Sequence, residues 1–584
     1  MIYEKYIRVL NIDLKTHKIR VDNREDLCQY LGGVGVASKL LSENMDPSKD
    51  PLDECQPIVF AIGPGSTLFP IITKTVACFI SPLTKEYGES YAGGRLALTM
   101  FHAGFDAIVI KGRSEKPIYL SINNNNIDFK DARTIWDLDL TEVGRVIRES
   151  ELGAGKRSII RSGIAGNNLC SFSNVCVDNF RHFGRMGLGA CFGSKNLKAI
   201  SIIGENNIPI KDFNGYFKVY QEIYKKCIDT GLMEKYHDLG TPVNVETLNA
   251  TSGFPTLNLQ KSSFEKGSNI SGETFADNNL VRKVACTGCP VGCIHVGQYR
   301  NEYDKNHEYE SVSVAYDYEL IFALGSFLGI SSTDDILKLI DEVEKVGVDA
   351  MSMGVVLGWA TEAFNNGLIN VEQTMVPLEF GNRENYAKAI DYTAKCTNEF
   401  YKDLSKGSHF VSNKYGGTEF AMNISKNEMA GYHTGYGSLV GAAVGARHSH
   451  LCNAGYSFDE KQKEGEFDPE KLAESLFQEE IERCVLNSLI ICLFGRKIYD
   501  RETVLRVLNS IGYEIDDEEF INIGKRIYKT KQLIKKALGY DNRMVKLPKR
   551  FFETTSSKGI LSEDVAMNII NKFNDKVDML ISEP

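Results

Sequence analysis

The segment Cys286-Thr287-Gly288-Cys289-Pro290-Val291-Gly292-Cys293 is the most informative stretch of the chain, because it places three thiols within eight residues. Gly288 and Gly292 let the backbone fold closely around whatever the sulfurs hold. A C-x2-C-x3-C spacing suits one face of a [4Fe-4S] cube, whose fourth iron can take a cysteine from far along the chain. The sequence therefore predicts an iron-sulfur site in this loop, with one remote ligand.

Zinc is the main alternative for the same thiols. Three thiolates and an imidazole can bind zinc tetrahedrally, and His295 lies two residues after Cys293. Zinc sites built on such loops usually have a second C-x2-C pair, and this sequence has none. Inert thiols are a third possibility. The spacing favours the cluster over both.

Composition narrows the class of protein. The chain has 584 residues, 14 cysteines, and 67 basic against 77 acidic residues, for a formal charge of -10. This balance excludes a disordered chain and argues against nucleic acid or an anionic membrane as the partner. The first twenty residues alternate like a strand, not a signal peptide, and no apolar run approaches the ~18 residues that span a bilayer. We expect a cytoplasmic protein whose reduced thiols are core residues or metal ligands.

The pattern of hydrophobic residues changes along the chain. Short β-prone runs such as 59–62, 75–80 and 107–111 alternate with glycine-rich turns in the first third. From about residue 210 the spacing becomes helical, for example over 334–346 and 469–494. The sequence predicts an α+β protein, with a β-rich N-terminal domain (1–207) and two mainly α-helical domains (208–415 and 416–584).

A glycine-rich segment over 184–195 invites comparison with phosphate-binding loops. Its order of glycine, serine and lysine does not match a Walker A loop, and no strand immediately precedes a dinucleotide-type glycine pattern. Arg181 and Arg185 could nevertheless pair with a phosphate held by the glycine backbone. A packed turn explains the glycines equally well.

Several segments, taken in order, resemble one family. They are Gly32-Gly33-Val34-Gly35, Gly63-Pro64-Gly65, Ser81-Pro82-Leu83-Thr84, Gly93-Gly94, Gly184-Arg185, Gly193-Ser194-Lys195-Asn196-Leu197, the cysteine loop and Gly347-Val348-Asp349. Their order and spacing resemble the tungsten-containing aldehyde:ferredoxin oxidoreductases over nearly the whole chain. The resemblance implies that the N-terminal sheets form a saddle for the cofactor.

The resemblance also implies the cofactors and their ligands. These are a [4Fe-4S] cluster, tungsten or molybdenum held by two pyranopterins, and Mg²⁺ joining the pterin phosphates through the backbone carbonyls of Tyr91 and His182. Cys492 would be the remote cluster ligand beside Cys286, Cys289 and Cys293, with Cys484 as its rival. The cofactor-binding residues would be Lys74, Gly93, Gly94, Arg181, His182, Gly184, Arg185, Glu344, Asp349, His450, Asn487 and Leu493.

Three of these positions depart from the family pattern. Lys74 stands where the family has an arginine between cofactor and cluster, which keeps the charge but loses the planar fork. Glu344 and Asn487 stand where the family has aspartates in its pterin-binding loops. Recognition of the pterin could therefore differ in detail.

For catalysis the resemblance implies a glutamate in a Tyr-Glu pair and a histidine in a Gly-Ala-x-His stretch. We assign these to Glu310 and His448, with Glu308 and His450 nearby. The expected reaction is oxidation of aldehydes to carboxylic acids, with electrons passing through the cluster to ferredoxin or an iron-sulfur subunit. The alternatives are another low-potential reduction, such as that of aromatic thioesters, and a non-catalytic electron-transfer subunit. A homo- or hetero-oligomeric state is left open.

Overall fold

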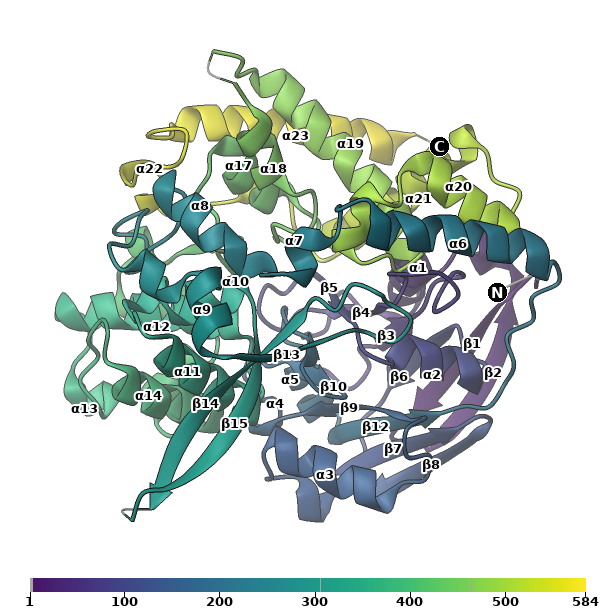
Figure 1. The fold of residues 1–584 in the computed structure, drawn as a ribbon, viewed down its shortest axis with the longest axis horizontal. Coiled ribbons are helices and arrows are strands. Elements are labelled where there is room, and N and C mark those ends of the chain that lie inside the picture. Colours follow the sequence, from purple (N-terminus) through teal and green to yellow (C-terminus); the bar gives the residue numbers. More distant parts are fainter. Residues whose placement is uncertain (1–3, 305, 464, 584) are drawn as a thin grey trace.

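The β-rich part of the chain comes first and forms the lower right of the molecule in Figure 1. The computed structural model describes residues 4–304, 306–463 and 465–583. One six-stranded sheet has the order β2-β1-β6-β3-β4-β5. Its strands are β1 (Ile7–Asp13), β2 (Lys18–Arg24), β3 (Ile58–Ala61), β4 (Thr75–Ile80), β5 (Tyr87–Ala92) and β6 (Ala107–Lys111). β3 and β4 are buried along their whole length, as their unbroken apolar runs require.

A second six-stranded sheet has the order β11-β10-β9-β12-β7-β8. Its strands are β7 (Ile118–Asn123), β8 (Asn126–Asp131), β9 (Ser158–Ser162), β10 (Val175–Val177), β11 (Arg181–Phe183) and β12 (Leu197–Ile203). Helices α1 (Gly33–Asn44), α2 (Leu96–Ala103), α3 (Leu140–Ser150), α4 (Ile164–Asn167) and α5 (Leu188–Ser194) connect and cover the two sheets. The β11 edge carries Arg181 and His182, two of the predicted cofactor residues.

The remaining chain is mainly helical. Its helices are α6 (Phe213–Asp229), α7 (Glu234–His237), α8 (Asn244–Ala250), α9 (Gly272–Asn278), α10 (Tyr318–Leu324), α11 (Thr333–Val346), α12 (Ala350–Asn365), α13 (Val371–Thr374), α14 (Arg383–Lys395), α15 (Glu399–Leu404), α16 (Ser408–Tyr415), α17 (Tyr436–Val444), α18 (Gly455–Lys461), α19 (Pro469–Ser488), α20 (Arg501–Ser510), α21 (Asp517–Ala537), α22 (Arg550–Glu553) and α23 (Glu563–Ser582). Their apolar faces pack into one core that is continuous with the sheets.

Two small β elements interrupt the helices. β13 (Leu280–Val284), β14 (Ile294–Asp304) and β15 (Glu308–Tyr316) form a three-stranded sheet, and β16 (Asn423–Ile424) pairs with β17 (Asn427–Glu428). The outer half of the β14–β15 hairpin extends away from the body of the molecule (Figure 1) and is exposed. The cysteine loop connects β13 to β14 at the packed base of this sheet.

Close packing explains the first glycine segment. Gly33 has φ +38°, and a Cβ there would lie 2.5 Å from the Asn487 carbonyl oxygen. A Cβ on Gly63 would lie 2.6 Å from the Leu489 carbonyl carbon. These contacts are possible only without side chains, and they bring the end of α19 onto the N-terminal sheet. The segment that carries Cys492 is thereby fixed against strands more than 400 residues earlier in sequence.

These observations confirm the predicted α+β class, with sheets first and mainly helical segments after them. The expected domain boundary at residue 207 falls between β12 and α6, and the one at 415 falls at the end of α16. Within the described residues, no single helix has the length and apolarity to cross a bilayer. One pair of helices passes that test jointly, over Tyr318–Leu328 and Thr333–Val346, and is bent by 109°.

Candidate functional site

A cavity of about 480 Å³ lies where the β-rich part meets the helical segments. The predicted metal and cofactor residues on its wall are Lys74, Arg181, His182, Gly184, Arg185, Cys286, Cys289, Cys293, Glu344, Asp349, His450, Asn487, Cys492 and Leu493. They come from strands, loops and helix ends that are up to about 420 residues apart in sequence. The fold therefore brings most of the predicted site together in one place.

The cysteine loop is held at this cavity by the segment Gly93-Gly94. The Thr287 N–H donates a hydrogen bond to the Gly94 carbonyl oxygen at 3.1 Å. A Cβ on Gly93 would lie 2.5 Å from Cys286 Sγ and 3.5 Å from Lys74 Nζ, so Gly93 must remain glycine for the thiol to fit. Gly93 thus allows the cysteine loop to approach closely, and the Gly94 carbonyl holds the loop in place.

Cys492 completes the set of four thiols. It follows α19, and its N–H donates to the Ile71 carbonyl oxygen at 3.2 Å, which fixes it beside the N-terminal sheet. Its rival, Cys484, lies two turns earlier in α19, is 1% exposed, and does not reach the cavity. The structure therefore places Cys492, and not Cys484, with the three loop cysteines.

The geometry does not suit zinc. Both His295 ring nitrogens face backbone carbonyl oxygens, at 2.9 Å from Asp238 and 3.3 Å from Cys293. Among the described residues, no three His, Cys, Asp or Glu side chains converge on a single ion position. Four thiols that line one cavity without meeting at one ion position suit a multi-iron cube, because its four cysteine ligands each bind a different iron and lie further apart than the ligands of one ion.

Positive charge lies among the thiols. Burial alone would lower the pKa of Lys74, but the neighbouring Cys492 and Cys286 thiolates outweigh it and raise that pKa. Burial alone would raise the pKa of the Cys286 thiol, but the positive charges of Lys74 and Arg181 outweigh burial and lower that pKa. The two cations therefore stabilise the Cys286 thiolate, the form that binds iron, whereas burial raises the pKa of Cys293 to about 11 and also raises that of Cys289.

Several buried polar side-chain atoms on the same wall have no hydrogen-bond partner among the residues that the structure describes. They include the Tyr91 hydroxyl, Asn174 Oδ1, Arg185 Nη1 and His450 Nδ1. A Cβ added at Gly184 would meet nothing within 4 Å, so the wall is open there. Unpaired buried polar atoms around an open space fit a polar ligand such as a pterin, which would satisfy them.

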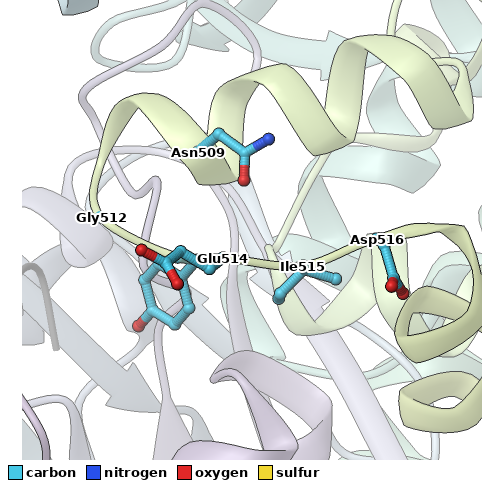
Figure 2. Close-up of a pocket in the computed structure, with 6 residues that line it drawn as sticks. Asn509, Gly512, Glu514, Ile515 and Asp516 are labelled. Carbon is cyan, nitrogen blue, oxygen red and sulfur yellow. The ribbon is translucent and has the colours of Figure 1, made fainter.

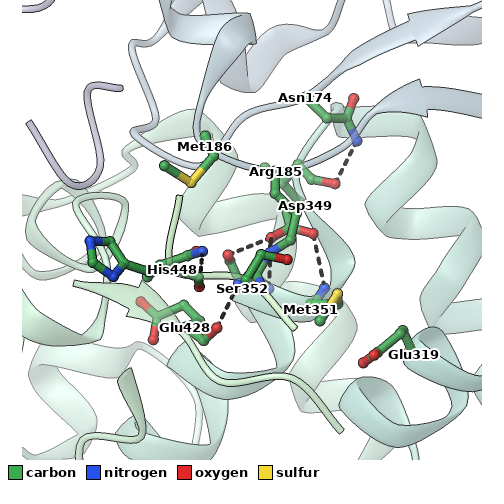
Figure 3. Close-up of polar contacts among 12 residues, drawn as sticks. Asn174, Arg185, Met186, Glu319, Asp349, Met351, Ser352, Glu428 and His448 are labelled. Carbon is green, nitrogen blue, oxygen red and sulfur yellow. Dashed lines mark hydrogen bonds and ion pairs between the residues drawn. The ribbon is translucent and has the colours of Figure 1, made fainter. Parts of the chain in front are cut away.

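Two acids of the predicted pterin loops already have partners. Asp349 caps α12 by accepting hydrogen bonds from the Met351 and Ser352 N–H groups, and it pairs with Arg185 Nε at 3.2 Å (Figure 3). Glu344 Oε2 lies 2.9 Å from His182 Nε2. Although burial opposes it, Glu344 raises the pKa of His182 to about 10, so this ion pair is charged at neutral pH. Both acids therefore orient basic residues at the cavity wall.

The two residues predicted to be catalytic do not lie at the cavity. Glu310 is exposed on the outer half of the β14–β15 hairpin, where its carboxylate accepts a hydrogen bond from the Asn301 amide at 3.1 Å. Glu308 is exposed beside it. This placement contradicts the assignment of Glu310 as general base, because the strands leave the packed base of the sheet before they reach it.

His448 is also misplaced for catalysis. Its side chain is fully buried, with Nδ1 3.0 Å from the Ala443 carbonyl oxygen and Nε2 2.9 Å from Glu86. Figure 3 shows His448 and Glu319 on opposite sides of the Arg185–Asp349 pair. His448 belongs to an internal polar cluster, which contradicts its assignment as the catalytic histidine.

A different glutamate and histidine meet at the cavity. Glu319 lies in the first turn of α10, and its Oε1 is 3.1 Å from Nε2 of His450. Burial raises the pKa of Glu319 to about 8, and burial together with Arg185 and Arg447 lowers that of His450 well below its usual value. Both side chains of the pair are therefore mainly uncharged at neutral pH. Glu319 can take up or release a proton at a pH close to neutral.

Glu319 is not among the residues predicted from the sequence, although the sequence contains a signal for it. Tyr318-Glu319 is a second Tyr-Glu pair after the cysteine loop, and it opens an apolar helix capped by Asp317. The sequence also did not predict the aromatic part of the cavity wall, which is formed by Tyr236, Tyr318, Tyr432, Tyr456 and Phe494.

Figure 2 shows a second concavity, separate from the cavity with the four thiols. Its lining consists of Asn509 and residues 512–516, at the connection between α20 and α21. It contains no cysteine, histidine or basic residue. The chemistry therefore concentrates in the cavity with the four thiols.

Comparison with known proteins agrees with this placement. Residues 9–204 match the family model of the aldehyde ferredoxin oxidoreductase N-terminal domain, and residues 218–579 match that of domains 2 and 3. The chain is 31% identical to the tungsten-containing aldehyde ferredoxin oxidoreductase of Pyrococcus furiosus, covering 95% of this chain and 93% of that protein. The Thermococcus kodakarensis enzyme of the same name is 30% identical, with the same two coverages.

Two further relatives differ in what they act on. The chain is 26% identical to the WOR-like subunit of an aliphatic sulfonate oxidoreductase from Pyrococcus furiosus, covering 90% of this chain and 85% of that protein. A solved chain in the active-site complex BamBC of benzoyl coenzyme A reductase, in complex with 1,5-dienoyl-CoA, has a TM-score of 0.84 at 18% identity, covering 99% of this chain and 94% of that one. At that identity the likeness shows the fold alone.

Proposed function

Because the chain belongs to the tungsten-containing aldehyde ferredoxin oxidoreductase family, we propose that it oxidises aldehydes to carboxylic acids in the cytoplasm. The reaction combines one aldehyde with one water and yields a carboxylate, three protons and two electrons. A cluster bound to the four thiols would supply one-electron transfer to a ferredoxin or a partner iron-sulfur subunit. The observation that carries this proposal is the Glu319–His450 pair on the same cavity wall as the four thiols.

The residues present fit the cofactors of such an enzyme. Cys286, Cys289, Cys293 and Cys492 would hold a [4Fe-4S] cluster, with the Lys74 ammonium beside them on the cavity wall. The unpaired polar atoms of Tyr91, Asn174 and Arg185 would bind the pterins, and the resemblance assigns the Mg²⁺ to the backbone carbonyls of Tyr91 and His182, two residues of the cavity wall. When bound, a tungsten or molybdenum bis-pyranopterin supplies the two-electron acceptor for the aldehyde carbon.

Glu319 and His450 would manage the protons. Deprotonated Glu319 accepts a proton from water or from the hydrated aldehyde, while the uncharged His450 ring donates a hydrogen bond that orients the substrate oxygen. Burial keeps the Glu319 carboxylate basic enough for this step, because its pKa of about 8 exceeds that of an exposed glutamate. The Gly431 N–H, which donates to Glu319 Oε2 at 3.0 Å, holds the carboxylate in place.

The same cavity argues against a non-catalytic electron-transfer subunit. Such a subunit needs the thiols, but it has no use for a buried acid–base pair or for unpaired polar atoms beyond them. Proteins of this family that reduce other substrates would share the cofactor wall, so the choice of reaction rests on the acid–base pair.

The test is metal analysis followed by an activity assay on anaerobically purified protein. We expect about four iron atoms per chain, as one cubane requires, together with one tungsten or molybdenum. Aldehyde-dependent reduction of a viologen dye should then be observed. Iron without tungsten or molybdenum, or zinc in place of iron, would contradict the proposal.

A further inference from the structure

Aromatic rings connect the acid–base pair to the rest of the cavity wall. The Tyr432 ring lies 5.3 Å from the His450 ring and stacks on Tyr456 at 4.5 Å, with only 13° between the two planes. Tyr318 lies 5.2 Å from Tyr432 on another side. All four residues line the cavity. The passage that leads away from Glu319 is therefore walled by flat, polarisable surfaces.

A second stacked pair continues this wall. The rings of Tyr236 and Phe494 lie 4.1 Å apart with 11° between their planes, and both face the same cavity. Next to them is Arg496, a cavity residue whose pKa is lowered by burial but raised more by its neighbours Tyr456 and Tyr236. The aromatic passage thus ends at a guanidinium.

That guanidinium has no anionic partner in the described part of the chain. Arg496 Nη1 donates to the Leu493 carbonyl oxygen at 3.2 Å. Glu479, the acid whose charge it feels, pairs with Arg483 at 2.6 Å instead. Of the other charged residues at this end of the cavity, Lys235 donates to Asn244 at 2.7 Å and Glu460 is exposed. The two cations Arg496 and Lys235 therefore face a single exposed acid, Glu460. Arg496 keeps hydrogen-bond donors for an incoming anion.

We propose that this passage selects planar aromatic aldehydes that carry an anionic group, with the substrate ring packed against the stacked Tyr432–Tyr456 pair and the anion on Arg496. This inference rests on the proposed function, because it assigns the substrate class of the same site. Stacked aromatic walls favour a flat ring over an aliphatic chain of similar size. A planar guanidinium recognises a carboxylate through two parallel hydrogen bonds.

The test compares two substrates in the wild-type enzyme and three variants. 4-Formylbenzoate carries the anionic group, benzaldehyde lacks it, and the ratio of their kcat/KM values is measured by viologen reduction. We expect the wild type to prefer 4-formylbenzoate, and Arg496→Gln to lower the ratio about tenfold, the loss expected for one charged hydrogen-bonded contact. Arg496→Lys should fall between them, because it keeps the charge but not the fork. Lys497→Gln removes a neighbouring exposed cation outside the cavity and should leave the ratio unchanged.

Binding provides a readout that does not depend on turnover. Terephthalate, the product of 4-formylbenzoate, is titrated by calorimetry into the purified holoenzyme, with cyclohexane-1,4-dicarboxylate as the non-planar control. We expect terephthalate to bind the wild type at least tenfold more tightly than it binds Arg496→Gln, and more tightly than the control ligand.

The outcomes separate this inference from the proposed function. Oxidation of benzaldehyde with an unchanged substrate ratio in Arg496→Gln supports the proposed function and overturns the inference. Terephthalate binding that depends on Arg496, without turnover of any aldehyde, supports the anionic aromatic subsite and overturns the proposed reaction. A change in the KM for ferredoxin alone would mean that Arg496 serves an acceptor protein, and would also overturn the inference.

Discussion

Replacing Glu319 by glutamine tests the reassigned acid–base pair most directly. The amide keeps the size of the carboxyl group and its position beside His450, but it cannot accept a proton from the substrate. General acid–base catalysis contributes about 10² to 10⁴ in rate, so we expect kcat/KM to fall by a factor in that range. Since each factor of ten corresponds to about 1.4 kcal/mol, the transition state loses roughly 3 to 5 kcal/mol.

The wild-type pH profile follows from the same residue. Burial raises the pKa of Glu319 to about 8, so the carboxylate form that accepts a proton is the minor form at pH 7. At one pH unit below its pKa, about one glutamate in eleven is ionised, and kcat/KM should therefore rise about tenfold between pH 7 and a plateau above pH 9. The direction of this change identifies Glu319 as a base. If Glu319 had to be protonated for catalysis, kcat/KM would fall as the pH rises over the same range.

The assay is initial-rate reduction of a viologen dye by metal-loaded enzyme from pH 6 to 9.5, with tungsten and iron content measured for each preparation. Glu310→Gln is the matched control, because this glutamate is exposed on the hairpin with a single Asn301 contact. It should retain activity within about twofold, as exposed substitutions usually do. A large loss in Glu310→Gln with normal metal content, or a wild-type pH profile retained by Glu319→Gln, would refute the reassignment.

Three further outcomes follow from the packing around the thiols and the internal ion pairs. Cys492→Ser should lower the iron content below four atoms per chain and alter the electron paramagnetic resonance signal of the reduced protein, whereas Cys484→Ser should leave both unchanged; equal loss in the two would contradict the assignment of the remote ligand. Gly93→Ala should reduce iron content with normal circular dichroism, because its Cβ would lie 2.5 Å from a cluster thiol; full iron loading would show that the loop can move aside. Lys531→Met should destabilise the fold by about 3 kcal/mol, because it removes the buried ammonium 2.7 Å from the Glu89 carboxylate and leaves the longer 3.5 Å pairing with Arg447; an unchanged calorimetric unfolding temperature would count against this.

The fold class and the grouping of the loop thiols at one cavity could be predicted because their signals are local or strongly patterned. Buried runs such as β4 and β6 are almost unbroken in apolar residues, and the three loop cysteines have a spacing that few other functions require. The remote thiol required a resemblance, since nothing in the sequence near Cys492 says that it returns to the loop. In the structure that return depends on Gly33 and Gly63, which let the end of α19 approach the sheet.

The acid–base pair that we propose could not be chosen from the sequence, because the choice depends on where a sheet stops being packed. Tyr309-Glu310 and Tyr318-Glu319 are only nine residues apart and have similar local composition. The β14–β15 hairpin carries the first pair into solvent, while the Asp317 cap turns the second into a buried helix. Burial separates the two pairs, and burial is a property of the tertiary structure.

The histidines show the same dependence within a single turn. His448 has φ +53°, a left-handed conformation, and the amide of Asn427 donates to the carbonyl oxygens of both Arg447 and His448. This backbone conformation directs the His448 side chain toward Glu86 in the interior. The side chain of His450, two residues later, contacts Glu319 at the cavity wall. The inner histidine is fixed in turn by Lys535, whose Nζ is 3.5 Å from the same Glu86 carboxylate. Helix α21 therefore supports the turn that carries His448 and His450 from the side away from the cavity. The C-terminal helices thus contribute to the site through residues that do not line the cavity.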